Sequence, residues 1–261
     1  MFRSCLVLAA FVVRLASGAA PDYSTDSILN GSNFTPAPFA PNSIISVFGT
    51  DLAYNTATIP AGTSLNFLPY ELGDVRVYVY NISAPLLYVS PTQINLLVPS
   101  NLKPNSVPLR VVRQGVTGAE VMIPLVAAAP QLFATDSKTV IAQHADYSLI
   151  TPDSPATPGE TIIIYATGLG PTQPNPAPGQ VPTQAWRISG ALTMLLDGTP
   201  VSPDLIKYAG VTPGTAGTYQ INLLLPGDLG SNPQIQAVIG DQISAPGIVL
   251  PTQPAVSNMR R

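Results

Sequence analysis

The chain has 261 residues, of which 46% are hydrophobic and only 10% are charged, and its formal net charge is −3. This composition is too apolar for intrinsic disorder, and without a basic run it excludes nucleic acid as a partner, because phosphate binding needs clustered Lys and Arg. The 29 Pro and 20 Gly follow no collagen-like period, so they predict short segments and exclude long helices.

The first 19 residues have the pattern of a secretory signal peptide. Arg3 supplies the positive start, Cys5–Val13 is the apolar stretch, and small residues lead to an expected cleavage after Ala19. This pattern predicts a protein that is secreted or displayed on the cell surface. Cys5 is the only cysteine, so the mature chain is predicted to hold itself together without disulfides. The apolar stretch is far shorter than the roughly 20 residues of a membrane span, and no later stretch is long and apolar enough to be one.

Two motifs occur twice, in the same order. Pro41–Ala53 is answered by Pro158–Gly170, and the identical pentapeptide Gln-Ile-Asn-Leu-Leu stands at 93–97 and at 220–224. We interpret this as a tandem duplication. The expected organisation is a signal peptide (1–19), a first domain (20–129), a second domain (130–252) and a frayed tail (253–261).

The first half predicts short strands bounded by turn residues, the pattern of an all-β sandwich. Between Asp74 and Tyr80, valines alternate with Arg and Tyr, as expected of a strand with one buried face. Asn81 then provides a turn, since Asn tolerates a left-handed backbone. The expected strands are 28–30, 43–49, 74–80, 84–89, 93–98, 109–112 and 120–126.

The second half repeats this plan. Asp197-Gly198 takes the place of the Asn81 turn, and the stretch between Tyr208 and Gln220 is seven residues longer than its counterpart. The expected strands are 161–167, 191–196, 205–208, 218–225, 234–239 and 243–250, the last two forming a hairpin around Gly240-Asp241.

The run between the domains, Ala127–Ala142, is too apolar for a flexible linker, which would be Gly/Ser-rich or charged. We expect it to pack as the first strands of the second domain, with Leu132 and Phe133 each mostly buried. This predicts a fixed orientation between the two domains.

The repeated pentapeptide has two interpretations. Period two places Ile94 and Leu96 on one face and Gln93, Asn95 and Leu97 on the other. In the structural interpretation the apolar pair faces the core and Asn95 bonds backbone groups at a strand end. In the functional interpretation Gln and Asn contact a ligand on an exposed face.

These residues also carry a family likeness. The runs Pro41–Ala53, Ala84–Asn95, Ala127–Pro130 and Pro158–Pro171 together resemble an uncharacterised C-terminal domain family of secreted acidobacterial proteins. Each half is similar to the immunoglobulin-like IPT/TIG fold. The resemblance implies two tandem IPT/TIG-like β-sandwiches and no catalytic residues. Asp74 and Asn81 stand where that family usually has Gly, which implies altered turns.

Candidate chemistry is sparse. His144 is the single histidine and lies beside Asp146, which could form half of a catalytic dyad, but Ser148 and Ser154 lack the turn context of a nucleophile. A Ca²⁺ site shared by Asp153 and Glu160 is one alternative to ordinary solvated turns. We expect no cofactor and no metal site.

Trp186 is the only tryptophan and follows a Pro-rich loop. It could stack on a sugar, because an aromatic ring presents a flat apolar face, or it could plug the end of the sandwich. It is the one candidate ligand-binding residue.

Three functions remain open. The first is a non-enzymatic module for adhesion, scaffolding or envelope attachment, with a protein or glycan of the envelope or extracellular matrix as its partner. The second is a carbohydrate-binding module that uses Trp186 and nearby tyrosines. The third is a hydrolase with a carboxylate pair.

Overall fold

The computed structural model describes residues 18–60, 62–135 and 138–254. All but the last two residues of the expected signal peptide lie outside these ranges, as does the tail from 255. Within them the all-β prediction is confirmed: the helical segments are two short 3-10 turns, Thr25–Ser27 and Pro203–Leu205. No helix in the described ranges is long and apolar enough to cross a membrane.

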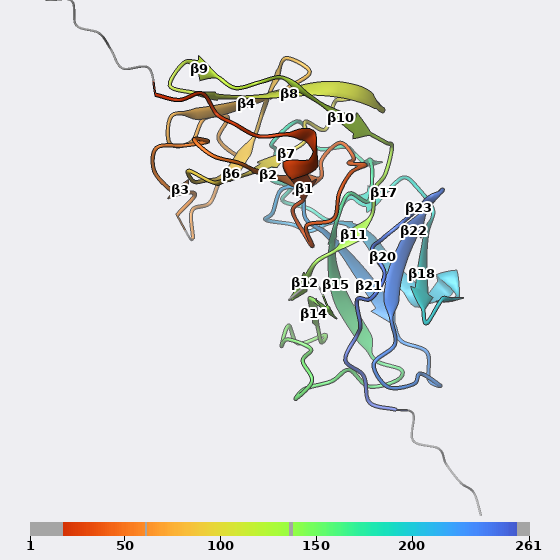
Figure 1. Cartoon of the computed structure of the whole chain (residues 1–261). Coiled ribbons are helices and arrows are strands. Elements are labelled where there is room, and N and C mark those ends of the chain that lie inside the picture. The colour runs from red at the N-terminus through yellow and green to blue at the C-terminus, as the bar shows by residue number, and fades with distance from the viewer. Residues whose placement is uncertain (1–17, 61, 136–137, 255–261) are drawn as a thin grey trace, which may run out of the picture.

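The first sandwich consists of two antiparallel sheets (Figure 1). One sheet has the order β1-β2-β7-β6-β3, and the other has the order β10-β8-β4-β5 with β9 beside β8. Their bounds are β1 Ile28–Asn30, β2 Ile44–Phe48, β3 Ala57–Thr58, β4 Val75–Val79, β5 Ile82–Ala84, β6 Leu86–Val89, β7 Gln93–Leu97, β8 Asn105–Arg113, β9 Val116–Thr117 and β10 Val121–Leu125.

The second sandwich repeats the arrangement. Its larger sheet has the order β11-β15-β21-β20-β17-β16 with β14 beside β15, its smaller sheet has the order β19-β18-β22-β23, and β12 pairs with β13. The bounds are β11 Gln131–Leu132, β12 Ala134–Thr135, β13 Thr139–Val140, β14 Ala142–Gln143, β15 Thr161–Thr167, β16 Thr172–Gln173, β17 Arg187–Ile188, β18 Leu192–Leu196, β19 Thr199–Pro200, β20 Ile206–Val211, β21 Tyr219–Leu224, β22 Ile235–Ile239 and β23 Gln242–Ile243.

The strand order identifies both sandwiches as immunoglobulin-like. In the lettering of that fold, one sheet is A-B-E-D and the other contains C, F and G. In the first sandwich β1-β2-β7-β6 follow A-B-E-D and β10-β8-β4-β5 follow G-F-C-C′. In the second, β11-β15-β21-β20 and β23-β22-β18-β19 give the same two orders. The repeated pentapeptide is therefore strand E in both copies.

The duplication extends to backbone irregularities. Both D–E pairs carry a register shift at the same place, between Leu86 and Tyr88 in the first sandwich and between Ile206 and Tyr208 in the second. Tyr88 pairs with Asn95, seven positions on, whereas Tyr208 pairs with Asn222, fourteen positions on. The predicted insertion of seven residues thus lies in the D–E connection of the second copy.

The turn after strand C is also shared. Tyr80 and Asn81 have φ of 49° and 60°, and Asp197 and Gly198 have φ of 48° and 75°. Two successive positive φ values are typical of the type I′ hairpin turn, which favours Asn-Gly and Asp-Gly because other residues resist that backbone. The expected turn at Asn81 is confirmed.

One expected strand is interrupted. The expected strand 243–250 forms a ladder only at Gln242–Ile243, followed by a bond from the Ser244 amide to Ala237 O, because Pro246 and Gly247 (φ 80°) then break the pairing. Pairing resumes at Val249, which bridges Gln234 on one side and Thr139 on the other.

Each sandwich has its own core. The first is built from residues between Tyr23 and Leu125, and the second from residues between Ala128 and Leu250. The predicted alternation of β4 is confirmed, since Val75, Val77 and Val79 are fully buried. The repeated pentapeptide follows the structural interpretation, with Ile94 and Leu96 at 0% exposure in the first core and Ile221 and Leu223 at 0% in the second.

The expected role of Asn95 was wrong in detail. Its Oδ1 accepts from Gln93 Nε2 at 2.8 Å and from Ser46 Oγ at 2.9 Å, so it bonds neighbouring side chains and not backbone groups. In the second copy Gln220 Nε2 donates to Asn222 Oδ1 at 3.1 Å in the same way. The repeated polar pair is a side-chain bridge along the outer face of strand E.

The run between the sandwiches packs as predicted. β11 and β14 pair with β15, and Leu132 is fully buried. Phe133 is only half-buried, although its amide donates to Tyr165 O and its carbonyl accepts from the Ile141 amide. Leu132 is therefore buried as expected, whereas Phe133 is more exposed than expected.

The two sandwiches lie against each other, the strands of the second running across the direction of those of the first (Figure 1). The inserted D–E connection lies in this contact: Ala216 packs with Leu68 and Leu97 in a small separate cluster. Leu97 points away from its own core, as period two predicts, and is nevertheless fully buried because the second sandwich covers it.

Hydrogen bonds also cross the contact. Thr167 Oγ1 accepts from the Ile44 amide at 3.0 Å and donates to Gly217 O at 2.8 Å. Tyr219, at 0% exposure, accepts from Asn42 Nδ2 at 3.1 Å and donates to Gly170 O at 2.7 Å. Backbone pairs between Leu68 and Gly179 and between Asn66 and Val181 extend the contact along one edge.

Candidate functional site

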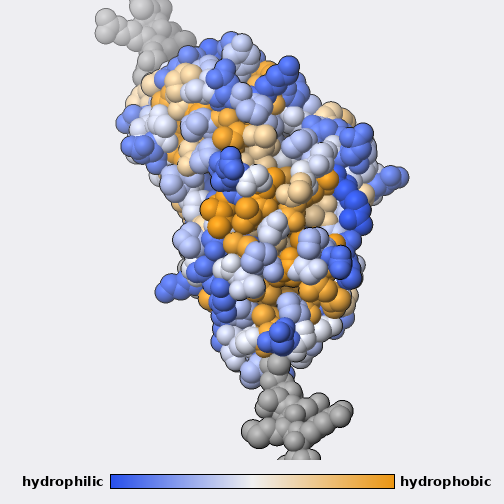
Figure 2. Space-filling model, turned by 90° about the vertical axis from the view of Figure 1, so that its right-hand side faces the viewer, coloured by the Kyte–Doolittle hydropathy of each residue, from blue (hydrophilic) through white to orange (hydrophobic). Residues whose placement is uncertain are grey.

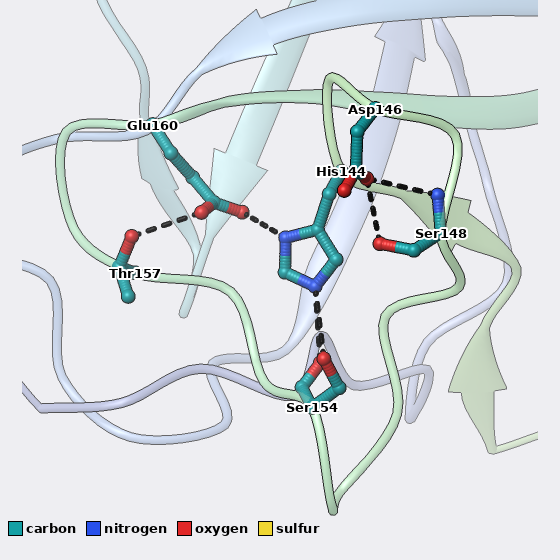
Figure 3. A network of polar contacts seen from close by, with 6 residues as sticks. All are labelled: His144, Asp146, Ser148, Ser154, Thr157 and Glu160. Atoms are coloured by element: carbon teal, nitrogen blue, oxygen red, sulfur yellow. Dashed lines mark hydrogen bonds and ion pairs between the residues drawn. The ribbon is translucent and has the colours of Figure 1, made fainter.

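His144 is the centre of a polar network in the second sandwich (Figure 3). It follows β14, and the loop 144–160 carries all of its partners before the chain enters β15. His144 Nδ1 lies 2.9 Å from Glu160 Oε1, and Thr157 Oγ1 donates to the other Glu160 oxygen at 2.9 Å. Both side chains of the pair are partly buried, at 18% and 24% exposure.

The dyad considered for His144 and Asp146 does not form. The Asp146 carboxylate turns toward Ser148, accepting from its hydroxyl at 2.6 Å and its amide at 3.0 Å (Figure 3). These two bonds, the hydroxyl first, hold the pKa of Asp146 below its usual range. Sequence neighbourhood suggested Asp146, but the loop closes so that Glu160, sixteen positions on, faces the imidazole.

Ser154 completes the network on the other side of the ring. Nε2 lies 3.4 Å from Ser154 Oγ and 3.2 Å from Ser154 O. When Nδ1–H donates to Glu160, Nε2 of the neutral ring is an acceptor and can accept a hydrogen bond from the Ser154 hydroxyl group. The protonated ring has a donor there, and the carbonyl is then its partner. Ser154 thus offers one suitable atom to each protonation state.

Ser154, His144 and Glu160 contact one another in the same succession as the residues of a Ser-His-Glu catalytic triad, but a free oxyanion-stabilising amide is missing at Ser154. The Ser154 amide, which could stabilise an oxyanion, already donates to Thr151 O and Oγ1, both at 3.1 Å. Thr151 donates back to Ser154 O at 3.0 Å, so the serine lies within a closed turn. The network is well suited to tying the loop to the start of β15.

The alternative Ca²⁺ site at Asp153 and Glu160 is not assembled. Both Glu160 oxygens are engaged, by His144 and Thr157. Within the described ranges, no group of three or more His, Cys, Asp or Glu side chains comes together as a metal site would require.

Trp186 is placed as a plug. Its side chain is half-buried and packs against the second core, just before β17. Its carbonyl accepts from the Val211 amide at 3.0 Å and from Tyr208 OH at 3.2 Å, which fixes the loop onto β20. The ring therefore packs against the sandwich, as the plug interpretation expects, while part of it remains exposed.

Several aromatic side chains are more exposed, among them Tyr147 at 69% and Tyr80 at 59%, and Tyr80 lines a hollow together with Asn101, Lys103 and Asn105. Sequence reasoning placed Tyr80 on the outer face of its strand but did not connect it with the loop 101–105, which is distant along the chain.

No family model and no curated protein matches the chain. Among solved structures, it is similar to SGBP-B of the Bacteroides ovatus mixed-linkage glucan utilization locus in complex with a mixed-linkage heptasaccharide, at 9% identity and a TM-score of 0.32, over 90% of this chain and 45% of that one. It is also similar to SGBP-B from a complex xyloglucan utilization locus in Bacteroides uniformis, at 11% identity and a TM-score of 0.26, over 88% of this chain and 49% of that one. A third similar structure is the tandem Ig repeats of Dlar, at 12% identity and a TM-score of 0.20, over 82% of this chain and 91% of that one. The chain spans less than half of either SGBP-B chain. At these scores the likeness carries no function across, and the assignment of two immunoglobulin-like sandwiches rests on the strand order.

Proposed function

We propose that this chain is a non-catalytic extracellular module that presents two immunoglobulin-like sandwiches in one fixed orientation to a partner in the cell envelope or extracellular matrix. The observation that carries the proposal is the interlocked contact between the sandwiches, where Ala216 and Leu97 pack together and Tyr219 is bonded to Asn42. A partner that touches both sandwiches then meets a preorganised surface, so that little conformational entropy is lost on binding.

The signal-peptide pattern supports export, and a chain without cysteine after residue 5 needs cores and contacts of this kind to remain folded outside the cell. The two cores and the buried contact between them supply that stability without disulfides.

Binding of the purified protein to isolated envelopes of the producing cells tests this proposal. We expect saturable binding that a urea-unfolded sample does not show. Absence of saturable binding to envelopes and to the culture matrix would contradict it.

A second candidate function is that of a serine hydrolase. It follows from the chain of contacts from Ser154 to His144 and from His144 to Glu160, which is the arrangement of a catalytic triad. Its test is covalent labelling of the protein by a fluorophosphonate, with Ser154→Ala as control. Because the Ser154 amide is already bonded to Thr151, we expect no labelling at Ser154. Labelling that disappears in Ser154→Ala would replace the non-catalytic proposal by an esterase.

A further inference from the structure

The smaller sheet of the second sandwich, β19-β18-β22-β23, turns a row of uncharged side chains away from the core. Met194 of β18 and Ala237 of β22 are fully buried, so period two places the residues on either side of them on the outer face. Cross-strand register aligns these outward residues on one surface. We call this surface the second outer face, and it consists of Thr193, Leu195, Pro200, Gln236, Val238 and Ile243.

The first sandwich provides an internal comparison, because the same strands there carry charge. Tyr78 pairs with Arg110 across β4 and β8, as Leu195 pairs with Gln236 across β18 and β22. The Arg110 guanidinium lies 5.1 Å from the centre of the Tyr78 ring, and Arg76 forms an ion pair with Glu71. Removing such charges from water is costly, so this first outer face favours solvent. Its corresponding residues are Arg76, Tyr78, Arg110, Val112 and Thr117.

The amide in the middle of the second outer face already has its hydrogen-bond partners. Gln236 is 7% exposed, its Nε2 donates to Ser244 O at 2.9 Å, and its Oε1 accepts from Gln234 Nε2 at 3.1 Å. Leu195 and Val238 are half-buried beside it, and Ile243 is 52% exposed. A partner that covers the face therefore buries apolar surface without leaving the Gln236 amide unpaired.

The second outer face lies on an open side of the molecule. β18, β22 and β23 lie at the right of the second sandwich in Figure 1, and Figure 2, which views that side, shows apolar residues gathered along the middle of the molecule. The exposed carboxylates nearest in the sheet, Asp197 and Asp241, lie in the turns that follow β18 and β22, at opposite ends of the face. Contiguous apolar surface of this kind marks an interaction site.

We propose that the second outer face is the contact of a homodimer, in which a second copy of the chain lies with the same face against it. A two-fold contact places a surface against itself, so the surface must be complementary to itself. An uncharged apolar face meets this condition. The first outer face does not, because it would place Arg76 and Arg110 against the same two cations of the other copy. Asp197 and Asp241 stay at the rim, where water and salt screen their repulsion. The inference goes beyond the proposed function and does not depend on it.

Sedimentation equilibrium of the purified protein at about 1–300 μM tests the proposal. We expect a reversible dimer with a dissociation constant of about 10–100 μM, since a face of six side chains makes a small interface. Ile243→Lys should raise this constant about tenfold or more, because a two-fold contact would bury two added ammonium groups. Val238→Lys should do the same. Ile243 is exposed, so its substitution should leave the monomer folded, which urea unfolding checks.

The duplication supplies matched controls. Thr117→Lys corresponds to Ile243→Lys, and Val112→Lys corresponds to Val238→Lys, since each pair of positions has the same register in its own sheet. Both controls should leave the dissociation constant unchanged.

A chain that is monomeric at every concentration would overturn the proposal, as would a dimer that Ile243→Lys and Val238→Lys leave intact or that the controls weaken equally. If the chain is monomeric and Ile243→Lys removes its binding to envelopes, the face docks a different partner and the homodimer is wrong. Envelope binding by a monomeric chain leaves the proposed function standing, so the two proposals fail separately.

Discussion

At the scale of single residues, Tyr219 joins the two sandwiches through its hydroxyl group. It is fully buried on strand E of the second sandwich, and its hydroxyl is bonded on one side to Asn42 and on the other to Gly170. Burial raises the pKa of Tyr219 to about 12, against a smaller lowering by the Asn42 bond. The neutral phenol is therefore the form that the fold requires.

This makes the contact sensitive to alkali. Because the folded pKa lies above the ordinary value of about 10, the stabilisation is complete below pH 10 and is lost as pH rises toward 12. We expect the free energy of unfolding in urea to fall by roughly 2–3 kcal/mol across that window through this one group. In Tyr219→Phe the protein should be less stable by about 1–3 kcal/mol at pH 8, since Asn42 Nδ2 and Gly170 O lose their partner. Its decline above pH 10 should be shallower than that of the unmodified chain; an equal decline would contradict the assignment.

Arg113 holds the start of the described chain. It is 1% exposed, stacks 4.1 Å from the Tyr54 ring, and donates to the carbonyls of Asp51 and Ala19. The expected signal cleavage after Ala19 would remove one of these acceptors.

We therefore expect a chain that begins at Ala20 to be less stable than one that begins at Gly18, by about 1–3 kcal/mol, because a buried donor of Arg113 loses its partner. Urea unfolding of the two forms measures the difference. In Arg113→Met the two forms should become equally stable, and a difference that survives there would show that Arg113 is not the cause.

At the scale of elements, the inserted D–E connection of the second sandwich is what distinguishes the two copies. Gly217 lies in it at φ 75°, and a Cβ there would meet Ile44 Cγ1 at 2.8 Å and Leu97 Cδ1 more closely still. Gly214 lies in the same loop at φ 82°, with nothing within 4 Å of such a Cβ.

Gly214 and Gly217 form a matched pair of sites for substitution, because both have a left-handed backbone and only Gly217 is crowded. Gly214→Ala should cost about 1 kcal/mol for its left-handed backbone alone. Gly217→Ala should cost about 2–4 kcal/mol, since the new methyl group also overpacks the contact. Chemical denaturation of both variants measures the difference, and equal costs would show that the loop does not hold the sandwiches together.

At the scale of the whole molecule, the orientation of the sandwiches should be fixed. The run 127–142 contributes β11 to the sheet of the second sandwich, and Ala129 donates to Gly168 O at 2.9 Å. Cleavage requires local unfolding of a segment, which such pairing opposes.

We expect limited proteolysis to leave this run intact while it trims the chain ends. Leu132→Ala should cost about 2–5 kcal/mol because Leu132 is fully buried, and it should open the run to protease. Phe133→Ala should cost less, because Phe133 is half-buried. Rapid cutting of the unmodified protein between the sandwiches would contradict a fixed orientation.

The sequence by itself determined the all-β class, the duplication, the alternation of β4 and the turns at Asn81 and Asp197. These depend on interactions between near neighbours and on period two, which the chain carries locally. It also determined that Leu97 points away from its own core.

Only the tertiary structure decided what covers Leu97, which carboxylate meets His144 and which loop lies beside Tyr80. Each depends on residues that are distant in sequence: Ala216 beside Leu97, Glu160 in place of Asp146, and the loop 101–105 beside Tyr80. Local pattern does not encode such pairings, because they are set by how two finished sandwiches and their loops pack against each other.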